Sequence, residues 1–242
     1  MRKVELAGAP WHNRERSIIL QNYSFFMPTR VIHGEKELLN QAGQLKQFGN
    51  KCLLVTGKNS ARLSGALDDA LEALKSQGIG YEHFDKVENN PSLENVAAGG
   101  EMARQYRPDF ILAIGGGSPL DAAKAIATLA TNQIEPEELY SNKFDNTPLP
   151  IVAIPTTAGT GSEVTPYSIL TVPEAETKRS FSVPELFPKM AFLDWRYTEK
   201  LPISITRDTA VDALSHLVEG YLSRRATGTS DIFAEQGMKL WA

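Results

Sequence analysis

The feature that most constrains the fold is a run of three consecutive glycines, residues 115–117, between an apolar stretch and an alanine-rich one. Residues 110–114 (FILAI) form a continuous apolar run, which is typical of a strand buried on both faces of a parallel sheet. Residues 118–130 are rich in alanine and suit a helix. The sequence therefore predicts a strand, a glycine turn and the N-terminus of a helix.

The beginning of this helix has residues that suit the positions they would occupy. Ser118 is a preferred N-cap residue, Pro119 fits the first helical position, and Asp121 places a carboxylate near the positive end of the helix dipole. Free backbone N–H groups at such an end bind anions, and glycines let a ligand approach the backbone. We expect the turn to bind phosphate or pyrophosphate; the alternative is a tight turn without a ligand.

Two familiar phosphate-binding motifs do not match the chain. Gly115 and Gly117 meet the start of the dinucleotide fingerprint G-x-G-x-x-G, but Leu120 stands where the third glycine belongs. A Walker A loop ends in Gly-Lys-Ser or Gly-Lys-Thr, and the closest stretch, residues 57–59 (GKN), lacks the hydroxyl residue. These departures exclude kinases and ATPases of the P-loop type.

Composition narrows the class of protein. The chain has 242 residues, of which 42% are hydrophobic and 22% charged, as in an ordinary globular protein. The net charge of −4 gives no electrostatic basis for binding nucleic acid or an acidic membrane. The one cysteine, Cys52, excludes an internal disulfide and is expected in the core. Because neither a signal peptide nor a membrane-spanning stretch is evident, we expect a cytoplasmic protein.

Strands and helices alternate before residue 200, and helices alone follow. This pattern predicts an α/β fold with a parallel sheet and a second domain after a boundary near Leu201. A hairpin of residues 168–172 and 179–183 would interrupt the alternation. We expect strands at 22–34 (two, broken at Pro28), 51–56, 80–87, 110–114 and 149–154, and helices at 35–48, 64–76, 92–106, from 208 or 209, and from 230 or 231.

A second candidate ligand segment follows the strand expected at 149–154. Residues 156–165 (TTAGTGSEVT) combine small hydroxyl side chains with glycines, as in loops that hydrogen-bond a ligand. After a strand of the same parallel sheet, this loop would lie at the same edge as the glycine turn. We therefore expect a ligand loop, with a flexible surface loop as the alternative.

The first helix after the boundary carries a candidate metal-binding pair. Asp212 and His216 are spaced i, i+4, so both side chains lie on one helix face, close enough to share a divalent cation. Glu219 follows three positions later. By spacing alone such a pair is more often a salt bridge on a helix surface, so both interpretations stay open.

Three segments together resemble the iron-containing (group III) alcohol dehydrogenase family. They are GGGSPLDAAKAIA at 115–127, PTTAGTGSEVT at 155–165 and VDALSHLVEGY at 211–221. SFFMPTRVIHG at 24–34 and NNPSLENV at 89–96 also look like that family. The resemblance thus covers most of the chain from about residue 22 onward.

The resemblance implies a fold and an activity. Residues 1–201 would form a Rossmann-like dinucleotide-binding domain, and 202–242 the N-terminal part of a truncated, all-helical metal-binding domain. The activity would be reversible oxidation of an alcohol to an aldehyde or ketone with NAD or NADP. The protein would act on small-molecule alcohols as a homodimer or larger homo-oligomer, without nucleic acid or membrane partners.

The resemblance also assigns roles to residues that match the family's motifs. Asp212 and His216, the catalytic pair, match the first two of four ligands for Fe²⁺ or Zn²⁺, and the metal would polarise the substrate oxygen during hydride transfer. The glycines and Ser118 would hold the pyrophosphate, Asn90 would lie near the adenosine half, and other residues would line the nicotinamide half. The cofactor residues are Gly57, Ser60, Asn90, Gly115, Gly116, Gly117 and Ser118, and toward the nicotinamide Asp121, Thr156, Thr157, Thr160 and Lys178.

The choice of dinucleotide depends on the turn after the strand at 51–56. Members of the family commonly have an aspartate there, which accepts hydrogen bonds from the ribose 2′-hydroxyl and repels a 2′-phosphate. This chain has Gly57 at that position, with Lys58 and Ser60 close by. Because an ammonium and a hydroxyl suit phosphate oxygens, NADP is expected to be preferred over NAD.

The chain departs from the family in its metal ligands. The family's pattern needs two more histidines downstream, and of the four histidines in the chain none follows His216. Two ligands hold a metal poorly, so we expect weak metal binding and no normal turnover from these 242 residues. Two alternatives stay open: an enzyme like glycerol dehydrogenase or dehydroquinate synthase, which share the fold, and a catalytically inactive nucleotide-binding module.

Overall fold

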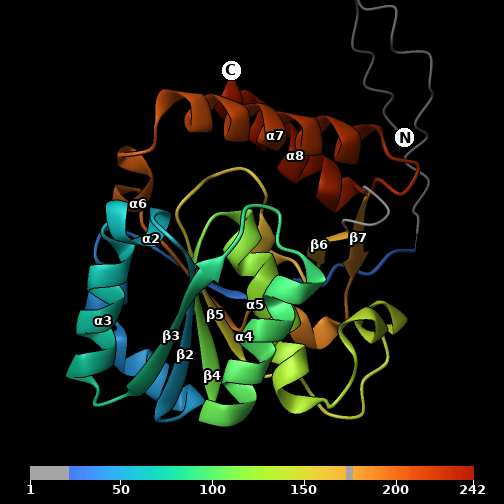
Figure 1. The fold of residues 1–242 in the computed structure, drawn as a ribbon. Helices are drawn as coiled ribbons and strands as arrows, with labels where there is room; N and C mark the ends of the chain where they lie inside the picture. Colours follow the sequence, from blue (N-terminus) through green and yellow to red (C-terminus); the bar gives the residue numbers. More distant parts are fainter. Residues whose placement is uncertain (1–21, 173–176) are drawn as a thin grey trace, which may run out of the picture.

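The computed structural model describes residues 22–172 and 177–242. Its centre is a six-stranded sheet in the order β1-β8-β5-β4-β2-β3, in which every neighbouring pair is parallel (Figure 1). Helices cover both faces, which confirms the predicted α/β class with a Rossmann-like parallel sheet. The strands are β1 (Arg30–His33), β2 (Lys51–Gly57), β3 (Gly80–Val87), β4 (Phe110–Gly115), β5 (Ile151–Pro155) and β8 (Met190–Leu193).

The interior strands bury side chains on both faces, which explains their continuous apolar sequences. Along β2, Leu53 and Val55 lie in one hydrophobic core, whereas Cys52 and Leu54 lie in the other. Successive side chains of a strand point to opposite faces, so a strand covered on both sides needs apolar residues at every position. The glycine-ended strand β4 alternates between the two cores in the same way.

Two long helices cover one face of the sheet and several shorter helices cover the other. On the first face the two helices approach closely at a glycine, since a Cβ added to Gly100 would lie 2.7 Å from Leu129 Cβ. Ser92 caps one of them, as predicted, by accepting a hydrogen bond from the Asn95 N–H. The first face has α4 (Leu93–Tyr106) and α5 (Gly117–Thr131), with η2 (Pro136–Ser141); the second has α1 (Glu37–Asn40), η1 (Ala42–Phe48), α2 (Ser60–Leu63), α3 (Ala66–Ser76) and α6 (Arg196–Glu199).

A two-stranded antiparallel hairpin, β6 (Ser168–Val172) and β7 (Thr177–Phe181), lies outside the main sheet. It confirms the predicted hairpin, although β7 begins at Thr177 rather than at 179. Leu170 and Phe181 belong to the same core as α5, and β6 packs against that helix. The short turns η3 (Ser162–Val164) and η5 (Pro184–Leu186) precede and follow the hairpin.

The segment before β2 differs from the prediction in two respects. Only β1 forms within 22–34, and the aromatic residues before it pack on distant side chains: Phe25 stacks on Phe233 with ring centroids 5.9 Å apart, and Phe26 packs edge-on against Phe187. The helix expected over 35–48 is broken at Gln41, where φ is −115°, and continues as the 3₁₀ turn η1. Gly43, a weak helix former, follows this break.

Strand β8 is an element that the sequence pattern did not reveal. It has four residues, too few to show a period, and lies in a segment marked by Pro184, Pro188 and Pro202. It pairs with β5 on one side and β1 on the other. Without β8, the N-terminal strand would have no connection to the rest of the sheet.

Helices α7 (Ile203–Leu222) and α8 (Gly228–Trp241) form a separate layer across one end of the sheet (Figure 1). Both begin earlier than predicted, because α7 starts directly after Pro202 and α8 follows a capping box of Thr227 and Ser230. α7 has no buried residue and α8 has one, Ala234. Within 22–172 and 177–242, no helix combines the length and the apolar character needed to cross a membrane.

Candidate functional site

The sheet has a topological switch point between β2 and β4. These strands are neighbours, but α3, which follows β2, packs on one face and α5, which follows β4, packs on the other. In open α/β sheets such a point opens a crevice beyond the carboxyl ends of the two strands, where ligands bind. Gly57 ends β2 and Gly115 ends β4, so both glycine segments singled out from the sequence border this crevice.

The glycines after β4 allow a turn that side chains would block. Gly115 has φ +149°, a conformation that residues with a Cβ rarely adopt. A Cβ on Gly116 would lie 3.1 Å from Thr157 Oγ1, and one on Gly117 would lie 2.8 Å from Thr160 Cγ2. The turn therefore packs tightly against the following loop and leads straight into the 15-residue helix α5.

The start of α5 differs from the prediction. The N-cap is Gly116, with no capping side chain among the described residues, and Ser118 and Pro119 are the second and third helical residues. Ser118 is not the cap because its Oγ accepts a hydrogen bond from the Asn90 N–H at 3.1 Å. The first N–H groups of the helix are therefore not occupied by a serine cap, which suits an anion at this end.

The loop of residues 156–161 lies against the glycine turn, at the same edge of the sheet. The Thr156 N–H donates to the Gly115 carbonyl at 2.9 Å, which holds the ends of β4 and β5 together. Thr157 and Thr160 contact the positions of Gly116 and Gly117. The Thr156 hydroxyl is buried and has no hydrogen-bond partner in the described part of the chain, as is expected where a ligand completes a site.

Asp121, expected toward the nicotinamide, makes hydrogen bonds within the protein. Its carboxylate accepts from Ser162 Oγ at 2.5 Å and from the Ile169 N–H at 3.1 Å. Burial raises the pKa of Asp121, and Lys124, with Nζ 3.6 Å from Asp121 Oδ1, opposes this shift. In this structure the carboxylate fastens the segment after η3 to α5.

Lys124 is a polar core residue that the sequence prediction did not single out. Its side chain is fully buried, and its Nζ donates to the Ser162 carbonyl, Ser162 Oγ and the Tyr167 carbonyl at 2.9, 2.7 and 2.7 Å. Burial lowers the pKa of Lys124 to about 8. The available signal was a single lysine within an alanine-rich helix that follows a strand predicted to be buried on both faces.

Asn90 and Lys178 meet beside the start of α5. Lys178 Nζ donates to Asn90 Oδ1 at 2.8 Å, and the Thr171 hydroxyl donates to the Asn90 carbonyl at 3.0 Å. Asn90 has φ +57°, which asparagine tolerates better than most residues. The sequence prediction put Asn90 and Lys178 at opposite halves of a cofactor, whereas here they are in direct contact.

The turn after β2 is open to solvent. A Cβ on Gly57 would have Val87 O, Pro119 Cγ and Ser60 Oγ as nearest atoms, at 3.6, 3.8 and 3.9 Å, so this position lies between β3, α5 and α2 without crowding. Lys58 and Ser60 are exposed, and Ser60 begins α2 instead of ending a simple turn. The turn thus presents a lysine and a hydroxyl beside the crevice.

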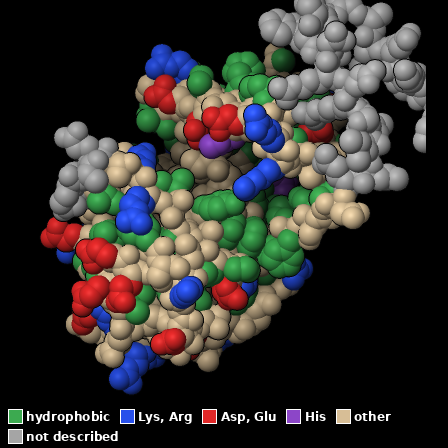
Figure 2. All heavy atoms as spheres, turned by 90° about the vertical axis from the view of Figure 1, so that its right-hand side faces the viewer, with side chains coloured by type: hydrophobic (Ala, Val, Ile, Leu, Met, Phe, Trp, Pro, Cys, Tyr) green, Lys and Arg blue, Asp and Glu red, His purple; other side chains and the backbone are tan. Residues whose placement is uncertain are grey.

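The candidate metal pair lies on the surface of α7. His216 Nε2 is 3.6 Å from Asp212 Oδ1, and the two side chains are 57% and 44% exposed. Thr209, three residues before Asp212 and therefore on the same helix face, touches the loop below, since a Cβ on Gly159 would lie 2.9 Å from the Thr209 carbonyl. The pair thus shares the α7 face that borders the α/β layer, and Figure 2 shows the surface hollowed between these layers.

The described residues do not supply a complete metal site. Within them no group of three or more histidine, cysteine, aspartate or glutamate side chains is close enough to hold a metal ion. Zinc and iron sites in proteins use three or four side-chain ligands, so Asp212 and His216 fit only part of one. The glycine turn, in contrast, leads into a helix N-terminus without a side-chain cap, a geometry that suits an anion.

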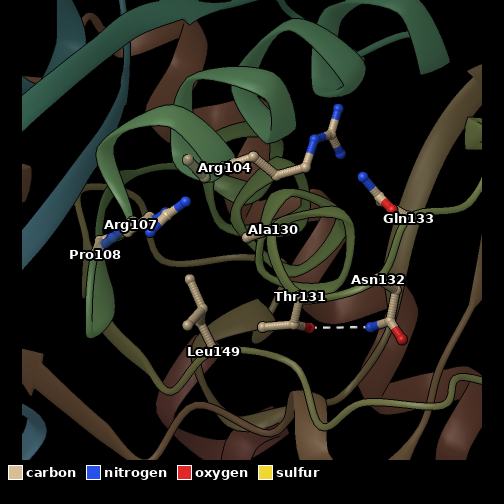
Figure 3. A pocket seen from close by; sticks show the side chains of 9 residues that line it. Arg104, Arg107, Pro108, Ala130, Thr131, Asn132, Gln133 and Leu149 are labelled. Carbon is tan, nitrogen blue, oxygen red and sulfur yellow. Dashed lines mark hydrogen bonds between the residues drawn. The ribbon is translucent and has the colours of Figure 1, made fainter.

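A cavity of about 430 Å³ lies elsewhere, near the C-terminal ends of α4 and α5 (Figure 3). Arg104 reaches along it and donates to the Leu129 carbonyl at 2.8 Å, and Arg107 lies at the end of α4. Both helices begin near the crevice and end here, so this cavity is at the opposite edge of the sheet from the glycine turn. It is not part of the candidate dinucleotide site.

Comparisons with known proteins agree with the resemblance seen in the motifs. The family model described as iron-containing alcohol dehydrogenase matches residues 28–195. The NADPH-dependent butanol dehydrogenase of Clostridium saccharobutylicum is 35% identical over 223 residues, which are 89% of this chain and 56% of that protein. The NAD-dependent methanol dehydrogenase of Bacillus methanolicus is 32% identical over 218 residues, 90% of this chain and 57% of that protein.

A solved structure gives the same relation in three dimensions. The crystal structure of an iron-containing alcohol dehydrogenase from Thermotoga maritima matches with a TM-score of 0.87 and 48% identity, over 91% of this chain and 61% of that one. The chain therefore spans between half and two thirds of the length of these relatives. The range matched by the family model, residues 28–195, spans all six strands of the parallel sheet.

Proposed function

We propose, since the chain belongs to the iron-containing alcohol dehydrogenase family, that it supplies the cofactor-binding part of an NAD(P)-dependent oxidoreductase. The complete protein would interconvert a small alcohol with its aldehyde or ketone. The observation that carries this proposal is the crevice at the switch point, bordered by the glycine turn and the threonine loop. Both segments have the space and the hydrogen-bonding groups that a dinucleotide needs.

The cofactor would lie across the carboxyl ends of β2, β4 and β5. Its pyrophosphate would meet the N-terminus of α5 at Gly116 and Gly117, where no side chain caps the helix and the helix dipole favours an anion. The nicotinamide would extend toward Thr156, whose buried hydroxyl has no partner within the described residues. Asn90 and Lys178 would then border the phosphates together, which their mutual hydrogen bond supports.

The open turn after β2 supports a preference for NADP. Gly57 leaves room for a 2′-phosphate, and Lys58 and Ser60 are exposed beside it. A charge-assisted contact contributes about 1.5–3 kcal/mol, enough for a preference of about tenfold or more. One of the relatives named above is NADPH-dependent and the other is NAD-dependent, so the relatives do not decide between the cofactors. The proposed preference for NADP therefore rests on the turn after β2.

Asp212 and His216 would be the part of the metal site that this chain carries, for Fe²⁺ or Zn²⁺. Their place on the α7 face that meets Gly159 supports a metal beside the nicotinamide end of the crevice. The described residues supply two of the ligands that such a metal would need. We also propose that the protein is cytoplasmic and, as the family resemblance implies, a homodimer or larger homo-oligomer.

The proposal is tested at the glycine turn by a matched pair of substitutions. Gly116→Val would push against Thr157 and so displace the threonine loop from the turn, whereas Gly43→Val adds the same side chain where the nearest atom to a Cβ is Gln77 Oε1, at 3.8 Å. Nicotinamide fluorescence should show NADPH binding to the unmodified chain and to Gly43→Val but not to Gly116→Val, with all three folded by circular dichroism. Equal binding by all three would refute a pyrophosphate site at this turn.

A second candidate function, a nucleotide-binding module without catalysis, is favoured by one observation. The described residues offer two metal ligands rather than a complete set. NADPH binding and alcohol oxidation are measured on the same preparation, with added Fe²⁺ or Zn²⁺. Turnover by these 242 residues would exclude the module, whereas binding without turnover is expected for both functions.

A further inference from the structure

Lys124 makes an unusual set of contacts from the middle of a buried helix. Its side chain has no exposed surface, and its Nζ reaches across to residues about 40 positions later in the chain. The three acceptors, the Ser162 carbonyl, Ser162 Oγ and the Tyr167 carbonyl, lie at 2.9, 2.7 and 2.7 Å. An ammonium has three N–H donors, so each proton has a partner.

Asp121, one turn earlier on α5, fastens the same segment from the other side. Ser162 Oγ, which accepts from Lys124, donates to Asp121 Oδ1 at 2.5 Å. The Ile169 N–H donates to Asp121 Oδ2 at 3.1 Å, and Ser168 Oγ donates to the Asp121 carbonyl at 2.7 Å. One turn of α5 therefore holds both ends of the stretch from Ser162 to Ile169.

Burying an ammonium group costs free energy of desolvation, so the presence of a lysine at this buried position requires an explanation. An apolar residue would fill the same space in the core without that cost. Asp121 on the same helix and Glu163 on η3 are the charged groups that face Lys124, and both favour its protonated form. The segment that receives these hydrogen bonds directly continues residues 156–161, which pack on Gly116 and Gly117.

We propose that Lys124 is a positioning residue that sets where the loop of residues 156–167 stands against the glycine turn. This inference rests on the proposed function, in which the loop meets the nicotinamide half of the cofactor. Lys124 touches neither the crevice nor the cofactor. It acts through Ser162 and Tyr167, whose backbone it anchors to α5. The adenosine half, bordered by Gly57 and Ser60 on other elements, does not depend on it.

The test compares Lys124→Met with Thr128→Val. Methionine keeps the length of the side chain without its donors, and Thr128 is a buried polar residue one turn further along α5 whose Oγ1 bonds only its own helix, at the Lys124 carbonyl. Two ligands are titrated, NADPH and adenosine 2′,5′-bisphosphate, which carries the adenosine half alone. Hydrogen exchange of the Val164, Thr165 and Ile169 amides is followed in the ligand-free proteins.

Lys124→Met should bind NADPH about tenfold more weakly, while its affinity for the bisphosphate changes by less than about twofold. The three amides should exchange about tenfold faster than in the unmodified chain, and amides of β4 should not change. Thr128→Val should leave both affinities and the loop amides as they are. A displaced loop would weaken the binding of NADPH and not of the bisphosphate, whereas a general loss of stability would weaken the binding of both ligands.

Three results would overturn the inference. The first is that the loop amides of Lys124→Met exchange hydrogen as fast as those of the unmodified chain. The second is that Lys124→Met loses affinity for NADPH and for the bisphosphate equally. The third is that Thr128→Val shows the same changes as Lys124→Met. If Lys124→Met does not fold, Ser162→Ala is used instead, because it removes one of the acceptors of Lys124. This variant should show a smaller loss of NADPH affinity and a smaller increase in loop exchange, with bisphosphate binding unchanged. If Ser162→Ala shows neither change, the inference is wrong. If the unmodified chain binds neither ligand, the proposed function fails, while loop exchange still decides whether Lys124 holds the loop.

Discussion

Helices α5 and α7 both border the candidate site, but they are stabilised in opposite ways. α5 buries 11 of its 15 residues, whereas α7 buries none of its 20. α5 is enclosed by α4, β4, β5 and the hairpin, so its geometry is determined by packing on every side. α7 packs mainly on α8 and leaves Ile203 84% and Leu222 67% exposed.

This difference in packing distinguishes the proposed dinucleotide site, which adjoins α5, from the proposed metal site, which is on α7. Helix stability comes mostly from packing, so the dinucleotide side of the site has a rigid scaffold while the metal side does not. The glycine turn leads into α5, the threonine loop after β5 packs against that turn, and the buried Lys124 of α5 is hydrogen-bonded to the segment that continues the loop. The groups on α7 are an exposed pair, Asp212 and His216, with half the ligands that a metal requires.

The largest expected effect comes from truncating apolar residues in the two layers. Leu112, fully buried on β4, should lose about 2–5 kcal/mol of unfolding free energy when changed to alanine, through lost burial and the cavity left behind. Leu222→Ala on α7 should change it by less than about 0.5 kcal/mol. Urea unfolding followed by circular dichroism measures both, and similar losses would mean that α7 is as well packed as the sheet.

The next effect is a dependence of stability on pH that originates at Lys124. Burial lowers its pKa from 10.5 to about 8, so between these values the unfolded chain binds more protons than the folded one. The unfolding free energy contributed by this group should therefore rise with pH across that window, by up to about 3 kcal/mol, and be lowest below pH 8.

Lys124→Met is the reference for this pH effect. Its unfolding free energy is subtracted at each pH, which removes the opposing contribution of groups such as Cys52, whose pKa is raised by burial. The unfolding free energy of the unmodified chain minus that of Lys124→Met should increase from pH 8 to pH 10. A difference that stays constant over this range would show that Lys124 titrates as it does in water.

A smaller effect is expected at the turn after β2. Gly57→Asp should weaken NADP binding by about tenfold or more through repulsion of the 2′-phosphate, and leave NAD binding nearly unchanged or improved. Gly43→Asp adds the same charge at a position away from the crevice and serves as the control. Calorimetry at low and high salt should show the discrimination shrinking as the charges are screened. Equal affinity of the unmodified chain for NAD and NADP at low salt would remove the basis for the preference.

The smallest expected effect on folding is at the metal pair. Asp212→Asn and His216→Ala remove an exposed interaction with the two atoms 3.6 Å apart, so the unfolding free energy should change by less than about 0.5 kcal/mol. The weak binding of Fe²⁺ or Zn²⁺ expected of the chain should be lost in both variants. Stoichiometric metal that survives dialysis against chelator in the unmodified chain would mean that further ligands exist.

The sequence was most informative where one interaction dominates. The continuous apolar runs of β2 and β4 indicated burial on both faces, and the glycine turn before α5 indicated a close approach of the backbone. Ser92 was identified as a cap because its hydrogen bond is local. Contacts within a few residues of each other are encoded by spacing and can be predicted from it.

Features that depend on distant contacts could not be predicted. Serine is a preferred residue at helix N-caps, yet the hydroxyl oxygen of Ser118 accepts a hydrogen bond from the N–H of Asn90, 28 positions earlier in the chain. β8 is defined by pairing with β1 and β5 rather than by its own four residues. Lys124 appeared as one lysine in an alanine-rich helix, and its partners lie 38 and 43 positions further along.

We propose that the dinucleotide site is complete within the α/β layer and does not depend on the metal pair on α7. The most direct test is calorimetric titration of NADPH into the chelator-treated 242-residue chain, before and after adding Fe²⁺ or Zn²⁺. We predict one dinucleotide bound per chain without metal, with an affinity that the metal does not change by more than about twofold. Binding that appears only after metal is added would contradict the claim.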